Sequence, residues 1–436
     1  MELKEIMKNA GIVGAGGAGF PSYAKLAGGV DTLLVNGAEC EPLLYTDYII
    51  LQREPDTVLK GITAVMQYLS ISKAILSVKE HTAKRLGYTD GQSFGKGVTV
   101  KFLPDVYPMG DEISLIYEST GRLVKPGNLP VSAGVIVYNV ETLYNVGMAL
   151  EGKPLTMKWL TVGGDIEKST VIKVPIGTKV SDLFESLGIT VPNTHSVLDG
   201  GPSMGKLIDP YTATVKKTTK GLLVIPNNTE AIISKNTNSK MAVARAETAC
   251  CQCTRCTDMC PRHLLGYPLE PHKMVRTAMQ AAVTLPQMVI SATLCCGCGI
   301  CESIACCQGI SPKAVINNYK ALLSQNKMRF SSNESFEVSR EREYRKLPVE
   351  RWAKALGILE FDKVPEYIGE RVNFKRFEIP LSQSIGAPSI PTVSIGDAVD
   401  EAEIIAKAAE GLSLPIHSPI KGKIAHCDEK KIIITR

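Results

Sequence analysis

Cysteine thiols are concentrated in one part of this chain. All but two of its thirteen cysteines lie between Cys250 and Cys307, in two unequal copies of one pattern. The first copy has the spacing C-x2-C-x2-C-x3-C-P and contains Cys250, Cys253, Cys256 and Cys260; the second has the spacing C-x2-C-x2-C-x4-C and contains Cys295, Cys298, Cys301 and Cys306. Three closely spaced thiolates suit one face of an iron–sulfur cubane, because a tight loop can direct each sulfur to a different iron.

The spacing predicts two [4Fe-4S] clusters that exchange their fourth ligands. In the C-x2-C-x2-C-x3-C-P run of bacterial ferredoxins, the last cysteine ligates the other cluster. The predicted ligand sets are Cys250, Cys253, Cys256 and Cys306 for the first cluster and Cys295, Cys298, Cys301 and Cys260 for the second. Cys307 stands where a proline would follow and competes with Cys306, while Cys251 and Cys296 are spare thiols. Two zinc sites are the alternative, although zinc requires two C-x2-C pairs per ion.

Composition limits the function classes. At 436 residues the chain is long enough for two to four domains with ample cores. The net charge of +5 comes from mixed signs without a basic stripe, so we expect no nucleic-acid partner. The N-terminal residues have no apolar signal core, and no apolar run is long enough for a transmembrane segment. We therefore expect a cytoplasmic protein that keeps its thiols for metal rather than for disulfides.

A glycine-rich loop stands near the N-terminus, in GIVGAGGAGFP, and contains Gly14, Gly16, Gly17 and Gly19. Three of these glycines match G-x-G-x-x-G, but that fingerprint requires a preceding strand, and Glu2–Asn9 predicts a helix instead. Backbone N–H groups in such a loop can still hold a phosphate. A plain surface turn is the alternative, and the density of glycines favours the phosphate site.

Alternating strands and helices follow the glycine loop. The pattern predicts strands at Thr32–Val35, Ala74–Val78 and Val98–Leu103, and helices at Pro55–Leu69 and His81–Leu86. This alternation is typical of a parallel sheet covered by helices. Ligands bind at the carboxyl ends of such strands, so the polar loop Asn36–Pro42 is a site candidate. Two later polar segments, Tyr107–Glu112 and Val137–Thr142, also end apolar runs.

Four motifs over about 150 residues carry a specific resemblance. GAGGAGFPSYAKL, NGAECEP, GDEISLIY and VYNVETL together resemble the FMN-binding domain shared by the complex I flavin subunit and the RnfC component of the Rnf electron-transport complex. The resemblance implies that the glycine loop and Lys25 hold the FMN phosphate. It implies further that Asn36, Glu39 and the catalytic Glu41 line the isoalloxazine and nicotinamide side, that Asp111 and Glu112 follow, and that Asn139 closes the site.

The same resemblance contains departures that concern NADH. Complex I flavin subunits carry an acidic residue at the position of Ala38, and aromatic residues that clamp NADH at two further places. Here Leu26-Ala27 and Asn128-Leu129 occupy those places. The sequence therefore supports FMN binding better than NADH binding.

The rest of the chain resembles three further modules, which makes the predicted fold a multidomain α/β protein. The predicted domains are an FMN-binding domain at 1–155, a soluble-ligand-binding (SLBB) β-grasp domain at 156–235, a helical ferredoxin-like dicluster segment at 236–325, a connector at 326–371 that is exposed over Asn326–Pro348, and an RnfC-type barrel-sandwich hybrid domain at 372–436. We expect the β-grasp domain to be a structural bridge. Carrier domains of the barrel-sandwich type present a lysine on a hairpin, whereas Lys407 lies in an Ala-rich run that predicts a helix.

The domain order resembles that of microcompartment cobalamin reductases and of the RnfC-like electron carriers of proline reductase. It implies an oxidoreductase that passes electrons from NADH through FMN and two [4Fe-4S] clusters to a partner reductase or a corrinoid. The alternative is a relay subunit of a larger redox complex that binds no nucleotide. The resemblance places the protein in the cytoplasm, inside a bacterial microcompartment or on the surface of a membrane complex.

Overall fold

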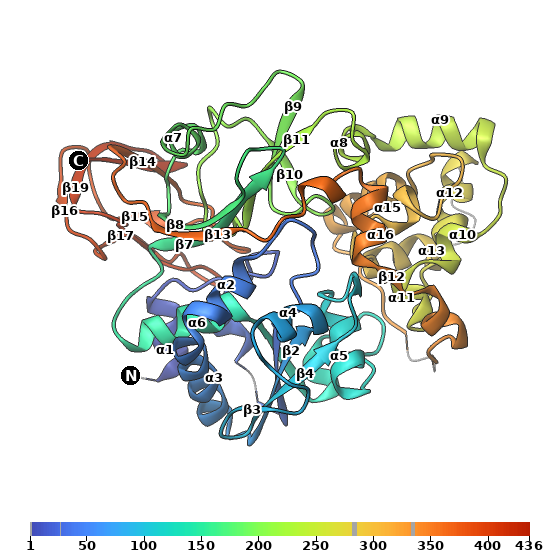
Figure 1. The fold of residues 1–436 in the computed structure, drawn as a ribbon, viewed down its shortest axis with the longest axis horizontal. Helices are drawn as coiled ribbons and strands as arrows, with labels where there is room; N and C mark the ends of the chain where they lie inside the picture. The colour runs from blue at the N-terminus through green and yellow to red at the C-terminus, as the bar shows by residue number, and fades with distance from the viewer. Residues whose placement is uncertain (1, 27, 281–285, 333–335) are drawn as a thin grey trace.

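The computed structural model describes residues 2–26, 28–280, 286–332 and 336–436. Figure 1 shows the N-terminal α/β domain at the bottom, a second sheet above it, the cysteine-bearing helices on the right and the C-terminal strands on the left. None of the described helices is long and apolar enough to cross a membrane. Ala27, at one of the two places where an aromatic clamp is missing, lies outside the described residues.

The N-terminal domain is built on a five-stranded sheet with the order β3-β4-β2-β1-β6. Its strands are β1 (Thr32–Gly37), β2 (Lys73–Lys79), β3 (Ser93–Gly95), β4 (Val98–Leu103) and β6 (Val135–Asn139), and all but β3 run parallel. Its helices are α1 (Leu3–Asn9), α2 (Thr46–Arg53), α3 (Pro55–Leu69), α4 (Glu80–Arg85), α5 (Glu112–Thr120) and α6 (Val140–Leu150). Apolar side chains leave alternately from both faces of β1, Leu33 and Val35 into one core and Leu34 into the other.

Close packing of α3 on α6 depends on small residues. A Cβ at Gly61 would lie 2.0 Å from the carbonyl oxygen of Leu143, and one at Gly147 would lie 2.2 Å from that of Thr57. The two helices can therefore approach only because both positions lack side chains. This contact fixes α6, whose N-cap, Asn139, lies at the carboxyl edge of the sheet.

A second sheet has six strands in the order β10-β9-β11-β7-β8-β13. Its members are β7 (Met157–Gly164), β8 (Thr170–Pro175), β9 (His195–Asp199), β10 (Lys206–Ile208), β11 (Gly221–Pro226) and β13 (Glu366–Glu370), with helix α7 at Val180–Ser186. β7 and β8 form an antiparallel hairpin, and β11 runs parallel to β7. β13 pairs in parallel with β8 although it follows the cysteine-bearing helices in sequence.

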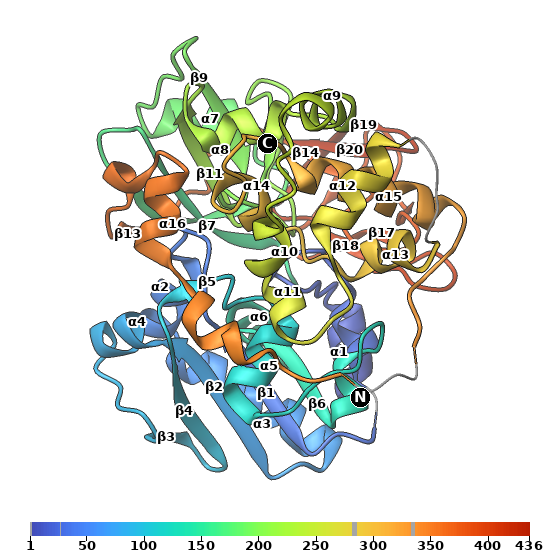
Figure 2. The same ribbon diagram turned by 90° about the vertical axis from the view of Figure 1, so that its right-hand side faces the viewer.

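The cysteine-bearing segment is helical. It comprises α8 (Glu230–Asn236), α9 (Ser239–Ala249), α10 (Arg255–Asp258), α11 (Pro261–Leu264), α12 (Pro271–Met279), α13 (Pro286–Ile290), α14 (Ile300–Ser303) and α15 (Pro312–Gln325). Figure 2 shows α11 directly above α5 of the N-terminal domain. The shortest helices, α10, α11 and α14, stand beside or within the cysteine motifs, while the longer α9, α12 and α15 pack together around them.

The connector after these helices is less exposed than the sequence predicts. β12 (Leu347–Pro348) pairs with β5 (Val106–Tyr107), and α16 (Val349–Ala355) buries Trp352 against Tyr107 with ring centroids 4.9 Å apart. The prediction of an exposed segment up to Pro348 is therefore wrong for its last residues, since Leu347 is buried in a core between domains. The charged side chains around Leu347 hid this contact.

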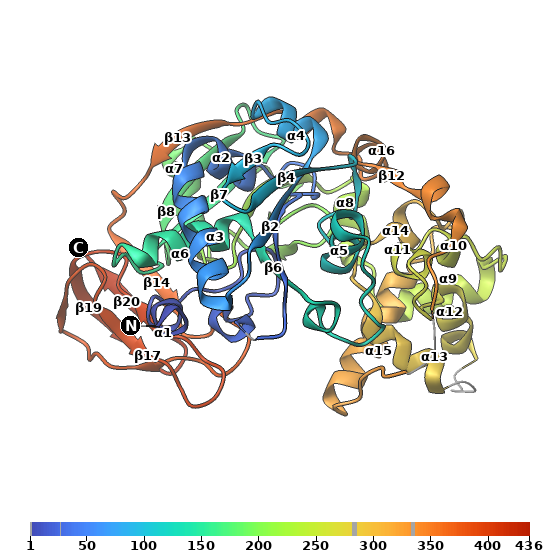
Figure 3. The same ribbon diagram turned by 90° about the horizontal axis from the view of Figure 1, so that it is seen from below.

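The C-terminal residues form two small sheets. One contains β14 (Arg376–Pro380), β16 (Ala398–Val399), β19 (Gly422–Cys427) and β20 (Lys431–Thr435); the other contains β15 (Ile390–Pro391), β17 (Ile404–Lys407) and β18 (Ile416–His417). Lys407 ends strand β17, so the helix predicted there is wrong: Ile404 and Ile405, both β-branched, favour the strand. Figure 3 shows α1 of the N-terminal domain beside β17 and β20.

Candidate functional site

Two cavities in the helical segment are lined by cysteines. The inner cavity is lined by Cys260, Cys295, Cys296, Cys298 and Cys301. The outer cavity is lined by Cys250, Cys251, Cys253, Cys256, Cys306 and Cys307. Each predicted ligand set therefore shares one cavity, with Cys260 and Cys306 crossing over between the motifs. The structure brings these side chains together, while the ligand assignment itself stays a prediction.

Tight turns direct the thiols into the cavities. Gln252 and Thr254 have φ values of 53° and 62°, and Gly297 and Gly299 have 79° and 86°. Each motif thus alternates left-handed residues with cysteines, which turns successive side chains toward one point. The left-handed Thr254 and Gly299 also stand at the N-termini of α10 and α14, which carry Cys256 and Cys301.

Backbone donors already serve two of the sulfurs. The N–H of Gly297 donates to Cys295 Sγ and the N–H of Ile310 donates to Cys306 Sγ, each at 3.3 Å. Hydrogen bonds to ligating sulfurs are a general feature of iron–sulfur sites. Cys307 instead meets the side chain of Gln308 at 3.9 Å.

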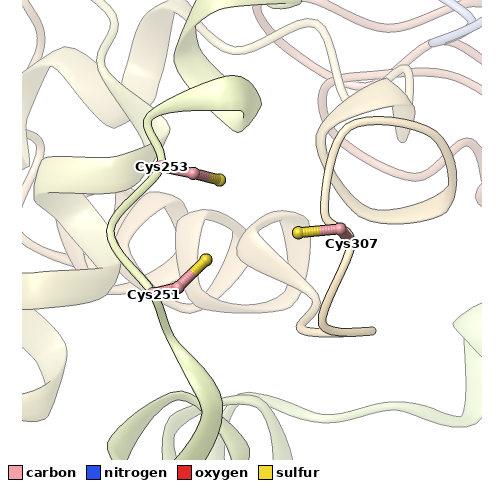
Figure 4. A group of neighbouring side chains, drawn as sticks. All are labelled: Cys251, Cys253 and Cys307. Atoms are coloured by element: carbon pink, nitrogen blue, oxygen red, sulfur yellow. The ribbon is translucent and has the colours of Figure 1, made fainter.

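Three thiols form a group of their own at the surface. Figure 4 shows the sulfurs of Cys251, Cys253 and Cys307 pointing toward one another, and the three lie within 4.8 Å. All three residues are exposed. The choice between Cys306 and Cys307 as the fourth ligand therefore has geometric arguments on both sides.

The inner cavity fits a cluster on two further grounds. Arg262 lines it, and the buried Nε of this arginine has no hydrogen-bond partner within the described residues. A buried donor without a partner indicates a missing acceptor, which a cluster sulfur would supply. In addition, burial raises the pKa of the Cys301 thiol far above its usual range, so metal binding must release the proton.

The glycine loop offers unused backbone donors. The N–H of Gly14 donates to the carbonyl of Phe20 and that of Ala15 to Thr142 Oγ1, whereas within the described residues the N–H groups of 16–19 donate to no protein group. Gly16 packs against the side chain of Asn139, and a Cβ at Gly17 would meet nothing within 4 Å. Free donors beside open space fit the phosphate of FMN.

Lys25 lies at the same edge of the sheet. Its Nζ donates to the carbonyl of Val137 and to Glu112 Oε1, each at 3.2 Å, and the side chain is 32% exposed. Glu112, also predicted as a flavin residue, is therefore the partner of Lys25. A phosphate could replace this half-exposed ion pair at little cost.

Asn36 and Asn139 join the ends of β1 and β6. Asn139 Nδ2 donates to the carbonyl of Asn36 at 3.3 Å and to Asp47 Oδ2 at 2.7 Å. Asn36 Nδ2 donates to the carbonyl of Gly110 at 3.1 Å. The two asparagines thus stand together at the carboxyl edge, as the sequence predicts.

The two acidic side chains of the Asn36–Pro42 loop are engaged with protein. Glu39 accepts from the N–H groups of Asp47 at 2.9 Å and Tyr48 at 3.1 Å, and so caps α2. Glu41 accepts from the N–H groups of Ser203 at 2.9 Å and Met204 at 3.1 Å, in the turn between β9 and β10. Both carboxylates hold the loop in place, and the catalytic role of Glu41 stays a prediction.

Asp111 reaches away from the flavin edge. Its Oδ2 caps α5 through the N–H of Ser114, and its Oδ1 accepts from Arg262 Nη2 at 2.6 Å. Arg262 follows the Cys260-Pro261 pair of the first motif. This ion pair therefore joins the N-terminal domain to the inner cavity.

Sequence reasoning missed a buried charge network beneath the flavin edge. Lys158 pairs with Glu141, and Lys220 Nζ pairs with Asp47 Oδ2 at 2.7 Å. Burial raises the pKa of Glu141, against the opposing effect of Lys158. These residues stand on apolar strands and helices, where no local pattern singles them out.

A buried lysine behind the glycine loop was also missed. Lys217 Nζ donates to the carbonyls of Gly11 at 2.8 Å and Pro415 at 3.1 Å, and burial lowers the pKa of this lysine to about 7. Nearby, the N–H of Ile385 donates to the carbonyl of Gly19 at 3.0 Å. The second sheet and the C-terminal domain thus support the loop from behind.

Comparison with known proteins matches this architecture. The sequence model of the Nuo51 FMN-binding domain matches residues 7–148, the 4Fe-4S dicluster domain matches 249–311, and the RnfC barrel sandwich hybrid domain matches 366–435. An FMN-binding domain and a dicluster domain in one chain define an electron-transfer flavoprotein with iron–sulfur clusters, an oxidoreductase. The predicted flavin, dicluster and barrel-sandwich domains are confirmed.

Whole-chain relatives identify the family. Cobalamin reductase PduS of Salmonella typhimurium is 35% identical over 439 residues, covering 100% of this chain and 96% of that protein. The RnfC-type component of the proton-translocating ferredoxin:NAD(+) oxidoreductase complex of Clostridium ljungdahlii is 35% identical over 269 residues, 60% of this chain and 56% of that protein. The chain therefore belongs to the RnfC-related family of iron–sulfur flavoproteins that contains PduS.

Solved structures add little. The NAD+-reducing [NiFe]-hydrogenase in its H2-reduced state is 18% identical with a TM-score of 0.46, covering 77% of this chain and 63% of that chain. This likeness is too weak to carry functional meaning.

Proposed function

We propose that this protein takes electrons from NADH at its flavin edge and delivers them through the inner and then the outer cluster to a partner. The observation that carries the proposal is the spatial order of the sites. The flavin edge lies in the N-terminal domain, the inner cavity adjoins that domain through the Asp111–Arg262 pair, and the outer cavity opens at the surface. FMN, when bound, takes two electrons as hydride and releases them singly to clusters.

In this proposal the chain's own groups bind and orient. The free N–H groups of residues 16–19 and the ammonium of Lys25 hold the phosphate, and Asn36 and Asn139 orient the ring edge. Glu39 and Glu41 keep the Asn36–Pro42 loop in one conformation through their backbone partners. Glu41 faces the nicotinamide side, as the family resemblance implies.

We assign the outer cluster to Cys250, Cys253, Cys256 and Cys306, and the inner cluster to Cys295, Cys298, Cys301 and Cys260. The lining of the two cavities and the hydrogen bond to Cys306 support this assignment. Serine variants of Cys306 and Cys307 provide a matched pair. Iron content and the outer-cluster signal should fall in Cys306→Ser and persist in Cys307→Ser; the reverse result would exchange the two roles.

The name of the full-length relative supports a corrinoid as the acceptor, reached directly or through a partner reductase, in a bacterial microcompartment or the cytoplasm. The β7–β8 hairpin, α7 and the parallel pairing of β11 with β7 support a β-grasp domain at 156–235. We propose that this domain is the structural bridge, because its turn at Ser203 and Met204 holds Glu41.

Stopped-flow measurement of flavin absorbance after mixing with NADH tests the proposal. NADH should bleach the flavin of the anaerobic protein, and the cluster absorbance should follow. Gly17→Val should remove flavin while both clusters remain, since φ at Gly17 is +155° and a branched side chain there would enter the phosphate space. If NADH leaves the wild-type flavin oxidised while dithionite reduces it, the protein is a relay subunit without a nucleotide site.

A further inference from the structure

Arg262 connects two parts of the molecule that do different chemistry. It is the second residue after Cys260, and its side chain is 13% exposed. The guanidinium donates from Nη2 to Asp111 Oδ1 at 2.6 Å, and Asp111 is only 9% exposed. Asp111 in turn follows Gly110, whose carbonyl accepts from Asn36 at the flavin edge. A short bonded path thus runs from the flavin edge to the guanidinium.

The other side of the guanidinium faces the inner cavity. Arg262 lines this cavity together with Cys296, and the positive charge of the arginine acts to lower the pKa of that thiol. Its Nε is buried without a partner in the part of the chain that the structure describes. The ring of Tyr267, 5.4 Å from the guanidinium carbon, packs against the guanidinium and limits its movement. The guanidinium is therefore fixed, charged and one hydrogen bond short.

Other charges around the inner cavity are already balanced or point elsewhere. Lys313 lines the cavity but pairs with Glu302 at 3.3 Å, and Lys320 donates to the carbonyl of Cys295 at 2.8 Å. No arginine stands at the outer cavity lining. Among the residues lining the two cavities, Arg262 is thus the buried cation with a spare donor.

We propose that Arg262 contacts the inner cluster through Nε, raises its reduction potential, and thereby makes it the first acceptor of electrons from the flavin, with Asp111 moderating this effect. The inference rests on the proposed inner cluster. A cluster gains one negative charge when it takes up one electron from the reduced flavin, and no proton is needed for balance. A fixed cation in a low-dielectric site stabilises that added charge, and a neighbouring carboxylate weakens the stabilisation.

An EPR-monitored redox titration of the full-length protein, with clusters and flavin in place, tests the inference. Arg262→Gln removes the cation and should lower the potential of the inner cluster. Asp111→Asn leaves the cation and removes the opposing carboxylate, so it should raise the same potential. Arg245→Gln is the matched control, because Arg245 donates to the carbonyl of Gln308 beside the outer cavity and should leave the inner potential unchanged.

Opposite shifts in the two variants are specific to an electrostatic role, since a merely structural pair would disturb the cluster in the same direction from either side. Shifts of the same sign, or no shift, would overturn the inference. If Arg262→Gln loses the inner cluster, Asp111→Asn decides alone: a raised potential supports the inference and an unchanged one overturns it. A wild-type protein with only about four irons would overturn the two-cluster function as well, and so separates the two failures.

Discussion

The inner and outer cavities are built from the same ligand pattern but stand in opposite surroundings. In the inner cavity Cys260, Cys298 and Cys301 are between 7% and 9% exposed, beneath a core shared with the N-terminal domain. In the outer cavity Cys251, Cys253 and Cys307 are exposed. One cavity is therefore placed for exchange within the molecule and the other for exchange with a partner at the surface.

The difference in burial has an electrostatic consequence. A low-dielectric site disfavours the extra negative charge of a reduced cluster, whereas solvent stabilises it. Without compensation the inner cluster would be the harder one to reduce. Arg262 and Lys313 supply positive charge at the inner cavity, which brings the two sites closer in potential.

Removal of the crossover ligand should have the largest effect. Cys260→Ala takes away a ligand that is buried in the inner cavity, so we expect the inner cluster to be lost and iron to fall from about eight to about four per chain. Anaerobic iron and sulfide assays with EPR measure the loss. Cys251→Ala is the control and should keep all the iron. If Cys260→Ala instead removes the outer cluster, the ligands do not cross over.

Metal removal should distinguish the cavities kinetically. An iron chelator, added anaerobically, should extract iron in two phases of about equal size, because solvent reaches the outer thiols first. Loss of the outer EPR signal should accompany the first phase. A single phase in which both signals fall together would mean that exposure of the cysteines does not control access to the clusters.

Alkylation should separate the two sides of the molecule. Cys40 Sγ packs against Gly110 near the inner cavity, and burial together with the charge of Glu41 raises its pKa to about 12. At pH 8 its thiolate fraction is about a thousandfold below that of an ordinary thiol, and only becomes substantial as the pH approaches 12. Mass spectrometry after brief iodoacetamide treatment should find Cys251 labelled and Cys40 unlabelled; denatured protein, the control, should be labelled at both.

The smallest effect should come from Lys25, at the flavin edge. Lys25→Ala removes one charge-assisted phosphate contact, which we expect to cost roughly 1.5–3 kcal/mol, or about 10- to 100-fold in FMN affinity. Flavin release measured by fluorescence tests this, and iron content should stay constant. Lys8→Ala is a suitable control because Lys8 stands over Tyr23 on the outside of α1. Equal weakening in both variants would argue against a phosphate at Lys25.

Local patterns predicted much of the fold. Helix α3 occupies Pro55–Leu69 as predicted, because a proline at its start and an apolar period both act within a few residues. The cysteine spacing likewise led to two sets that the structure brings together. The contacts of Glu41 with Ser203, of Asp111 with Arg262 and of Lys217 with Gly11 span more than a hundred residues each. No periodicity records such contacts, so the tie between the domains could not be predicted.

The support behind the glycine loop has a consequence for how the protein is made. Residues 11–19 emerge first from the ribosome, yet they contact Lys217, Ile385 and Pro415. Domains fold as they are synthesised, so the N-terminal sheet can form early while its loop still lacks these partners. The loop reaches its final conformation only after nearly the whole chain has been translated. We therefore expect flavin to be among the last components to join the protein, and a chain that stops before residue 385 to lose it first.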